Sequence, residues 1–192
     1  MYRIGVLALQ GDFAKHIQAL LNLGQHAFEV RCKADLKKAD ALILPGGEST
    51  TVLKLLHESG FNKDIHTFLD THPAMGTCAG LIILARKVAN LPYDPLNLID
   101  ITVNRNAYGR QRESFVDKIR VNLNGIESSV EGVFIRAPQI TQYGPDVRIL
   151  GYHNGMPVLA ANKHILVCTF HPELTHDLSL HQYFIDYFIR QK

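Results

Sequence analysis

The stretch Gly76-Thr77-Cys78-Ala79-Gly80 leads directly into the apolar run Leu81-Ile82-Ile83-Leu84-Ala85. Small residues on both sides of Cys78 allow the chain to turn tightly from a strand into a helix, and the turn presents one side chain at its tip. The N-terminal end of that helix would favour the thiolate form of Cys78. We therefore expect Cys78 to be a nucleophile, and the simpler alternative is a tight turn around a buried, unreactive cysteine.

The residues before this elbow alternate short apolar runs with helical patterns, which is typical of strands joined by crossover helices. Residues 4–9 form an unbroken apolar run, as in a strand that is buried on both faces. Residues 13–23 carry apolar side chains at helical spacing and stop before Gly24, a residue that commonly ends helices. The other elements expected here are strands at 27–30 and 39–44, a weak strand at 73–75, a helix at 52–57 capped by Ser49-Thr50-Thr51, and a helix at 63–69.

The second half of the chain is richer in strand formers. A final helix is expected over 180–189, where large apolar side chains share one broad face. The strands expected in this half are 99–103, 115–123, 132–135, 147–152, 157–160 and 165–170. The sequence thus predicts an α/β fold of three layers, with a mainly parallel or mixed central sheet between flanking helices, in one domain over residues 1–192.

Composition and charge exclude several classes of protein. The chain has 192 residues, 46% of them apolar, and its 20 Lys and Arg against 18 Asp and Glu give a net charge of +2. This balance, without a long run of like charges, argues against a nucleic-acid-binding face. The apolar run at 4–9 is too short for a signal-peptide core or a membrane span, so we expect a cytoplasmic protein.

The cysteine and histidine spacing argues against a metal site. Cys32, Cys78 and Cys168 show no Cys-x-x-Cys spacing, so we expect no disulfide framework and no thiolate zinc site, and Cys32 and Cys168 are expected to be packing residues. There is no His-Glu-x-x-His motif. The nearest local cluster of ligand types is His171, Glu173, His176 and His181. We expect neither a metal nor a cofactor.

A base for Cys78 is offered by Phe170-His171-Pro172-Glu173, which follows an apolar strand pattern. Residues two apart in an extended chain point to the same side, so Glu173 can bond one ring nitrogen of His171 and leave the other to face Cys78. Pro172 favours an extended conformation at His171. A surface His-Pro-Glu turn is the alternative, but both motifs follow predicted strands at the edge where open α/β sheets hold their sites.

A third element is the loop Pro45-Gly46-Gly47-Glu48-Ser49, which also follows a predicted strand. Paired glycines allow backbone N–H groups to face a developing oxyanion. We assign the oxyanion hole to the N–H groups of Gly47 and Ala79. A phosphate-binding loop is less favoured because the Gly-Lys-Ser/Thr ending is absent.

Together these elements resemble the class I glutamine amidotransferase family, whose motifs are Pro-Gly-Gly, Gly-x-Cys-x-Gly and His-x-Glu, and the likeness runs across nearly all of the chain. Within that family the chain resembles the glutaminase subunits of pyridoxal 5′-phosphate synthases. The motifs that carry this narrower resemblance are Leu9-Gln10-Gly11, residues 44–51, residues 76–82, Arg105-Asn106 with Gly109-Arg110-Gln111, Phe134-Ile135-Arg136-Ala137-Pro138, and residues 170–175.

The resemblance implies that Cys78 attacks the side-chain amide of glutamine, that His171 relays the proton, and that Glu173 orients His171. It also implies which residues hold the glutamine: Gly47, Glu48, Ser49, Arg105, Ile135 and Arg136. A physical argument agrees for the arginines, because a guanidinium can form bidentate bonds with the carboxylate of an amino acid. Either arginine could instead belong to a surface ion pair.

The resemblance further implies a partner, the barrel-shaped synthase subunit of pyridoxal 5′-phosphate synthase, which takes up the ammonia. The chain shows no nucleotide fingerprint and no second motif for an ammonia acceptor, which fits this expectation. Docking of the partner could alter the oxyanion site through Gln10 and the Gly46-Gly47 loop. Two other readings stay open: a thiol hydrolase or peptidase built on the same elbow, and a catalytically silent regulatory subunit in which Cys78 is structural.

Overall fold

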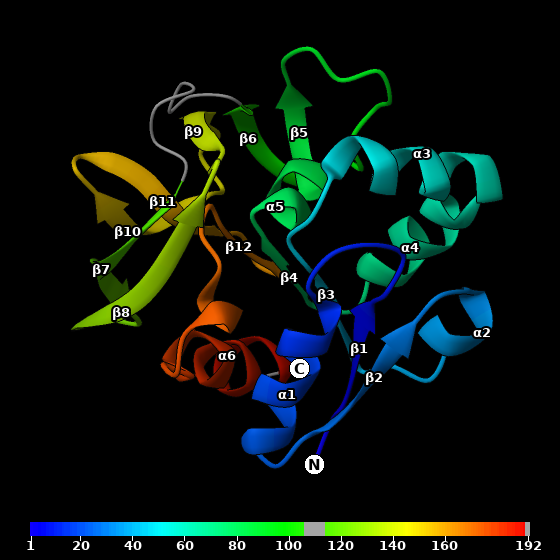
Figure 1. Ribbon diagram of the computed structural model, residues 1–192, viewed down its shortest axis with the longest axis horizontal. Helices are drawn as coiled ribbons and strands as arrows, with labels where there is room; N and C mark the ends of the chain where they lie inside the picture. The colour runs from blue at the N-terminus through cyan, green and yellow to red at the C-terminus, as the bar shows by residue number, and fades with distance from the viewer. Residues whose placement is uncertain (106–113, 191–192) are drawn as a thin grey trace.

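The computed structural model describes residues 1–105 and 114–190 (Figure 1). Its helices and strands follow one another along the chain, and the short helical turns are labelled η. They are β1 (Arg3–Leu7), α1 (Phe13–Asn22), β2 (His26–Val30), α2 (Lys33–Leu36), β3 (Ala41–Leu44), α3 (Ser49–Ser59), α4 (Phe61–Leu69), β4 (Ala74–Thr77), α5 (Ala79–Leu84), β5 (Ala85–Val88), β6 (Ile99–Asn104), β7 (Ser114–Leu123), β8 (Ile126–Ile135), β9 (Gln139–Tyr143), β10 (Arg148–His153), β11 (Met156–Ala161), β12 (Ile165–Cys168), η1 (Pro172–Leu174), α6 (Ser179–Tyr183) and the π-helical η2 (Phe184–Ile189).

A nine-stranded sheet in the order β2-β1-β3-β4-β12-β11-β10-β7-β8 forms the centre of the molecule. The pairings from β2 to β12 are parallel, and those from β12 to β8 are antiparallel. The sheet is therefore mixed. Because β1, β3, β4 and β12 run in the same direction, the loops that follow them meet at one edge of the sheet, where α/β proteins commonly bind ligands.

Helices cover both faces of this sheet, which confirms the predicted α/β fold with flanking helices. Side chains alternate between the faces along each strand. In β3, Leu42 and Leu44 join the core beneath α3, α4 and α5, whereas Ala41 and Ile43 join the core beneath α1, α6 and η2. Figure 1 shows α1 and α6 together on one side and α3 and α4 on the other. Burial of these two cores from water stabilises the layered arrangement.

A second, three-stranded sheet in the order β5-β6-β9 was not expected from the sequence. β5 continues directly from α5, so the apolar run of the elbow helix conceals where the helix ends and the strand begins. β9 has the sequence Gln-Ile-Thr-Gln-Tyr, in which only Ile140 is fully buried, so its apolar signal is weak. The short helix α2 was missed as well.

Several predicted boundaries were wrong by a turn or less. α3 begins at Ser49, so Ser49-Thr50-Thr51 forms its first turn, and Glu48 occupies the capping position. β12 ends at Cys168, but an antiparallel bridge between His171 and Val133 keeps the following residues extended. The last helix changes from α to π geometry at Phe184. The prediction that the first helix stops before Gly24 is confirmed. α1 ends at Asn22, and Gly24 has a φ of +71°, which favours glycine.

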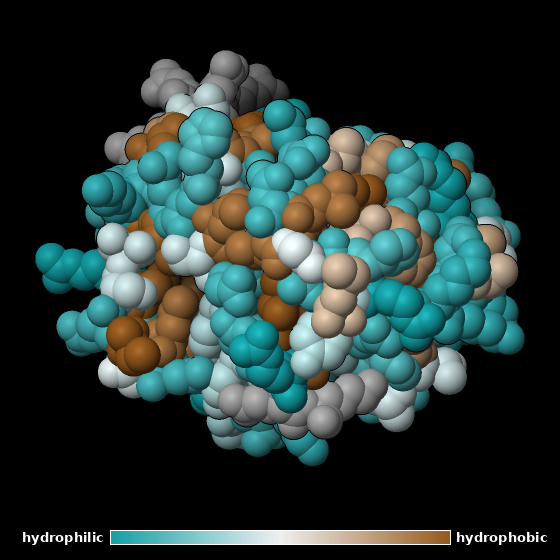
Figure 2. All heavy atoms as spheres, turned by 90° about the horizontal axis from the view of Figure 1, so that it is seen from below, coloured by the Kyte–Doolittle hydropathy of each residue, from teal (hydrophilic) through white to brown (hydrophobic). Residues whose placement is uncertain are grey.

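Seen from below, the surface is mostly hydrophilic, and its apolar atoms form separate patches (Figure 2). The exposed large apolar side chains belong to different elements and include Leu21 on α1, Val116 on β7 and Ile126 on β8. No helix in the described part of the chain combines the length and the hydropathy that a membrane crossing requires. The cytoplasmic location stays a prediction.

Candidate active site

Cys78 lies at the elbow between β4 and α5 with φ 47° and ψ −99°, a conformation that side chains other than glycine seldom adopt. Such strain is kept only where the surrounding structure holds it. Here the Cys78 N–H donates to the carbonyl of Cys168 at 2.9 Å, and a Cβ on Gly80 would overlap with the backbone oxygen of Leu44. The small residues around the elbow are therefore required for α5 to pack against β3, and Cys78 stands at the N-terminus of α5.

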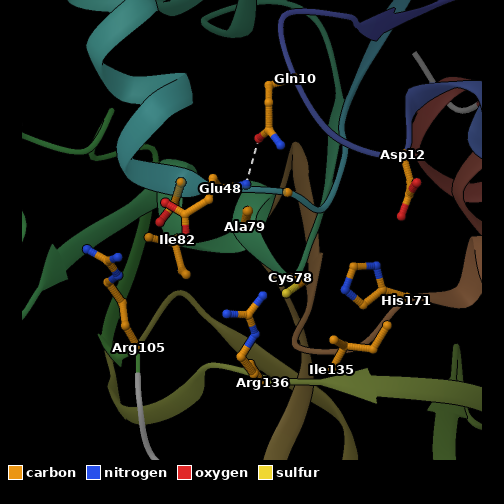
Figure 3. A pocket seen from close by; sticks show the side chains of 12 residues that line it. Gln10, Asp12, Glu48, Cys78, Ala79, Ile82, Arg105, Ile135, Arg136 and His171 are labelled. Atoms are coloured by element: carbon orange, nitrogen blue, oxygen red, sulfur yellow. Dashed lines mark hydrogen bonds between the residues drawn. The ribbon is translucent and has the colours of Figure 1, made fainter. Parts of the chain in front are cut away.

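His171 and Glu173 follow β12 at the same edge of the sheet. The backbone N–H of His171 donates to the carbonyl of Val133 at 2.8 Å, and this bond fixes the segment against β8. Nδ1 of His171 lies 2.7 Å from Oε1 of Glu173, which comes from η1, and both side chains are buried. Figure 3 shows the sulfur of Cys78 beside the ring of His171. The structure thus brings together the three residues that the sequence predicts as catalytic.

The electrostatics of the site favour the charged forms of His171 and Glu173. Burial by itself would lower the pKa of His171, but hydrogen bonds to Cys78 and Glu173, together with their charges, outweigh it and raise this pKa to about 10. Burial would raise the pKa of Glu173, but the neighbouring His16, whose Nε2 lies 3.4 Å from Oε2, and then the hydrogen bond and charge of His171 bring it well below its usual range. His171 is therefore an imidazolium at neutral pH, held between the carboxylate of Glu173 and the sulfur of Cys78.

A cavity of about 310 Å³ opens beside Cys78, a size at the lower end of small-molecule sites. Of the residues predicted to act in the site, only Glu173 does not line it, because Glu173 lies behind His171. The lining residues are Gln10, Asp12, Gly47, Glu48, Ser49, Cys78, Ala79, Ile82, Arg105, Ile135, Arg136 and His171 (Figure 3). The motif residues Asn106, Gly109, Arg110 and Gln111 lie outside the described residues.

The cavity contains charges of both signs. Arg105 and Arg136 supply two guanidinium groups, and neither forms an ion pair with another described residue. Arg136 has φ 43°, a second strained position next to the cavity. Glu48 and Asp12 supply carboxylates. Cations and carboxylates around one small space suit a zwitterion such as a free amino acid.

Three residues near the site were given no catalytic or binding role by the sequence. Oε1 of Gln10 accepts the backbone N–H of Glu48 at 2.6 Å, so the β1 loop is bonded to the Gly46-Gly47 loop. Asp12 points its carboxylate toward His171 (Figure 3). His16 contacts Glu173, and its only signal was a polar residue on the apolar face of a predicted helix.

One group of side chains has the spacing of metal ligands among the described residues. Asp12, His171 and Glu173 each place a ligand atom within 4.8 Å of the others. Nδ1 of His171 and Oε1 of Glu173 are already hydrogen-bonded to each other, which favours a proton rather than a metal between them.

The other two cysteines differ from each other. Cys168 packs at the end of β12 and donates its thiol to the carbonyl of Phe170 at 3.3 Å, and burial raises its pKa well above the usual value. The packing role predicted for Cys32 is wrong, because Cys32 is exposed between β2 and α2 and bonds Asp35. The strand predicted at 27–30 ends before Cys32, and so does β2 (His26–Val30).

Known proteins are similar to this chain in sequence and in fold. A chain from Niallia circulans named pyridoxal 5′-phosphate synthase subunit PdxT is 48% identical over 185 residues, which cover 96% of each chain. A PdxT chain from Fervidobacterium nodosum is 44% identical over 95% of each chain. A solved structure described as a glutamine amidotransferase has a TM-score of 0.89 at 43% identity and covers 96% of this chain and 97% of its own.

A more distant structure, a Thermoplasma acidophilum protein described as a GMP synthase component, has a TM-score of 0.71 at 19% identity, covers 100% of this chain and 96% of its own, and shares the fold. The model of the SNO glutamine amidotransferase family matches residues 6–190. That match spans all three motifs and nearly the whole sheet. The chain therefore belongs to the SNO glutamine amidotransferase family.

Proposed function

We propose that this chain is the glutaminase subunit of a pyridoxal 5′-phosphate synthase and acts as one domain over residues 1–192. It hydrolyses L-glutamine and supplies the ammonia to the synthase subunit. The observation that carries the proposal is the contact of Cys78 with the His171–Glu173 pair beside a small cavity that holds two arginines. The names of the PdxT relatives support the pathway.

The first half of the reaction uses the proton on His171. The thiolate of Cys78 attacks the side-chain amide carbon of glutamine, and the carbonyl oxygen becomes an oxyanion that the N–H groups of Gly47 and Ala79 would stabilise. His171 then donates its proton to the amide nitrogen, and ammonia leaves. A glutamyl thioester on Cys78 and a neutral His171 remain. Glu173 keeps the ring oriented throughout.

The second half returns the site to its starting state. Neutral His171 takes a proton from water as the water attacks the thioester. Collapse of this second tetrahedral intermediate breaks the carbon–sulfur bond and restores the thiolate of Cys78 beside the imidazolium of His171. The product leaves as glutamate, with its new carboxylic acid proton released.

The bond between Gln10 and Glu48 suggests how a partner could control the site. It ties the loop after β1 to the loop that carries Gly47. The partner is the barrel-shaped synthase subunit, and contact with the β1 loop would change the position of Gly47 and hence of the oxyanion site. Glutamine would then be hydrolysed only where its ammonia can be used.

The test is glutamate release by the purified chain with and without a pyridoxal 5′-phosphate synthase barrel subunit, together with formation of the cofactor from glutamine. We expect faster release in the complex and cofactor synthesis that requires this chain. Equal rates would remove the partner control. Absence of glutamate release in both cases, or faster cleavage of esters and peptides than of glutamine, would overturn the glutaminase proposal.

Gly46→Ala is expected to lower glutamine hydrolysis by at least about 100-fold, since displacing a catalytic group by about 1 Å can cost that much. A Cβ at Gly46 would overlap with Cε1 of His171 and come within 2.8 Å of its Nδ1. The ring must move. Initial rates of glutamate release measure the effect. Gly24→Ala is the control for backbone strain away from the site, because its φ of +71° disfavours alanine but the added Cβ meets nothing within 4 Å. Equal rates for Gly46→Ala and wild type would contradict the placement of the ring.

Arg105→Ala is expected to raise the KM for glutamine by about 10- to 100-fold with a smaller change in kcat, as for loss of a charge-assisted hydrogen bond that acts equally in the ground and transition states. Its guanidinium lines the cavity and has no ion pair among the described residues. Steady-state kinetics measure this split. Arg86→Ala, which removes an arginine paired with Asp100 outside the cavity, is the control. An unchanged KM would assign Arg105 to structure.

A further inference from the structure

A second histidine, His16, lies behind Glu173 in the described structure. It comes from α1 and is 0% exposed. Its Nε2 lies 3.4 Å from Oε2 of Glu173 and 3.2 Å from the hydroxyl of Thr77, the residue before Cys78. Its Nδ1 lies 3.0 Å from Nε2 of His181, which comes from α6. One ring therefore contacts the carboxylate, the strand that carries the predicted nucleophile, and the C-terminal helix.

The proton positions in this cluster are fixed by what each atom can do. An ionised carboxylate only accepts, so Nε2 of His16 must carry a proton to bond Glu173. Nδ1 of His16 is bonded to Nε2 of His181, whose own Nδ1 has no partner among the described residues and suits a lone pair, so Nε2 of His181 is the donor of this bond. Burial and the neighbouring His16 outweigh Glu173 and Asp177 and lower the pKa of His181 to about 3, so His181 is neutral.

The remaining atoms agree with this assignment. Nδ1 of His181 is buried without a hydrogen-bond partner among the described residues, which suits a lone pair better than a buried N–H. Oε2 of Glu173 also has no hydrogen bond of good geometry in the described part of the chain, so its charge depends on the longer contact with His16. Apolar packing alone does not explain His16, because burying a polar ring costs free energy unless it is paired.

We propose that His16 is a positioning residue of the glutaminase, whose Nε2–H holds the carboxylate of Glu173 so that its other oxygen stays on Nδ1 of His171. His181 sets the tautomer of His16. The inference rests on the function proposed above. It adds a contact behind Cys78, His171 and Glu173, because the bond to Thr77 also joins α1 to the end of β4, directly before Cys78.

Loss of His16 should change the pKa of His171, because both rings contact Glu173. The titratable groups around the His171–Glu173 pair are Cys78 at the elbow, Asp12 after β1, His16 on α1, Cys168 at the end of β12, and His181 on α6 with Asp177 next to it. Without the N–H of His16 on its Oε2, the carboxylate of Glu173 is free to turn away from Nδ1 of His171, and it then holds the imidazolium less firmly. The pKa of His171 should then fall, and His171 should lose its proton at lower pH.

His16→Met and His16→Gln test the proposal in the complex with the synthase subunit. Met fills the space without a donor, whereas the amide N–H of Gln can reach the same oxygen. We expect His16→Met to lower kcat about 10- to 100-fold, as for a lost hydrogen bond to a charged group, with KM changed less than about twofold. The basic limb of its pH–rate profile should move to lower pH. His16→Gln should regain most of the wild-type kcat, and the basic limb of its pH–rate profile should lie at the wild-type pH.

His153→Met is the matched control, because it also removes a buried histidine bonded to a carboxylate, but that carboxylate is Asp117 on β7. We expect the pH–rate profile of His153→Met to match that of wild type. An unshifted pH profile in His16→Met, or equal losses in His16→Met and His16→Gln, would show a merely structural role and overturn the proposal.

Two readouts do not depend on glutamine hydrolysis. The first is the pH dependence of alkylation of Cys78 by iodoacetamide, followed by mass spectrometry in a Cys32→Ser background because Cys32 is exposed. We expect His16→Met to shift this alkylation profile and His16→Gln to restore it.

The second readout is the ¹⁵N spectrum of histidine-labelled wild type, which should show His16 protonated at Nε2. Protonation at Nδ1 instead would overturn the proposal even if His16→Met does not fold. Wild type that releases no glutamate but shows both signatures would overturn the function alone.

Discussion

Cys78→Ala is expected to abolish glutamate release, with a fall of at least about 10⁴-fold, because removal of one member of a nucleophile–base pair removes the covalent route. No other described residue of the cavity offers a thiol. Alanine is small enough for the crowded elbow, so the fold should persist. Initial rates of glutamate release, with a thermal midpoint within a few degrees of wild type, are the measurement.

Cys32→Ala is the matched control for the Cys78 variant, since it removes an exposed thiol far from the cavity and should leave the rate unchanged. A chloroketone analogue of glutamine adds a second test, because it should label Cys78 in wild type and leave Cys168, which is fully buried with a raised pKa. Hydrolysis that survives Cys78→Ala would assign the reaction to another group and make Cys78 structural.

β1 and β3 in the parallel half of the sheet were predictable because these strands are buried on both faces. Such strands appear as unbroken apolar runs: β1 (Arg3–Leu7) overlaps the run at residues 4–9, and β3 consists of the four apolar residues 41–44. The second sheet was not predictable in this way. β9 carries three exposed residues, and β5 follows α5 without a turn residue between them, so neither interrupts the pattern as a separate strand would.

The site was predictable where its chemistry is confined to a few adjacent residues. The elbow around Cys78 and the pair His171 and Glu173 are each local motifs, and the sheet brings their ends together. His16 has no such motif, since it is a single polar residue among the apolar positions of α1. Its partner His181 lies 165 residues further along the chain, and only tertiary packing places them together. The binding roles of Arg105 and Arg136 came from resemblance and stay predictions.

Glu173→Gln is expected to lower kcat by about 10⁴-fold near neutral pH, as does the equivalent carboxylate-to-amide change in serine protease triads. The shape of the side chain is kept, but its negative charge is lost, and an amide N–H can face Nδ1 of His171. The ring then adopts the wrong tautomer or turns away. Glutamate release measures kcat, and Glu29→Gln, at an exposed glutamate paired with Arg31, is the control.

The pH–rate profile of Glu173→Gln should also shift, and the direction of the shift can be predicted. In wild type the pKa of His171 is raised to about 10, so its imidazolium is present below that pH and is lost as the pH rises through it. Removing the charge and hydrogen bond of Glu173 removes part of what raises this pKa, so the basic limb of the kcat/KM profile must move to lower pH. The hydrogen bond to Cys78 remains, so the shift is partial. A basic limb that moves upward, or stays in place while kcat falls, would mean that Glu173 acts on the fold rather than on the charge of His171.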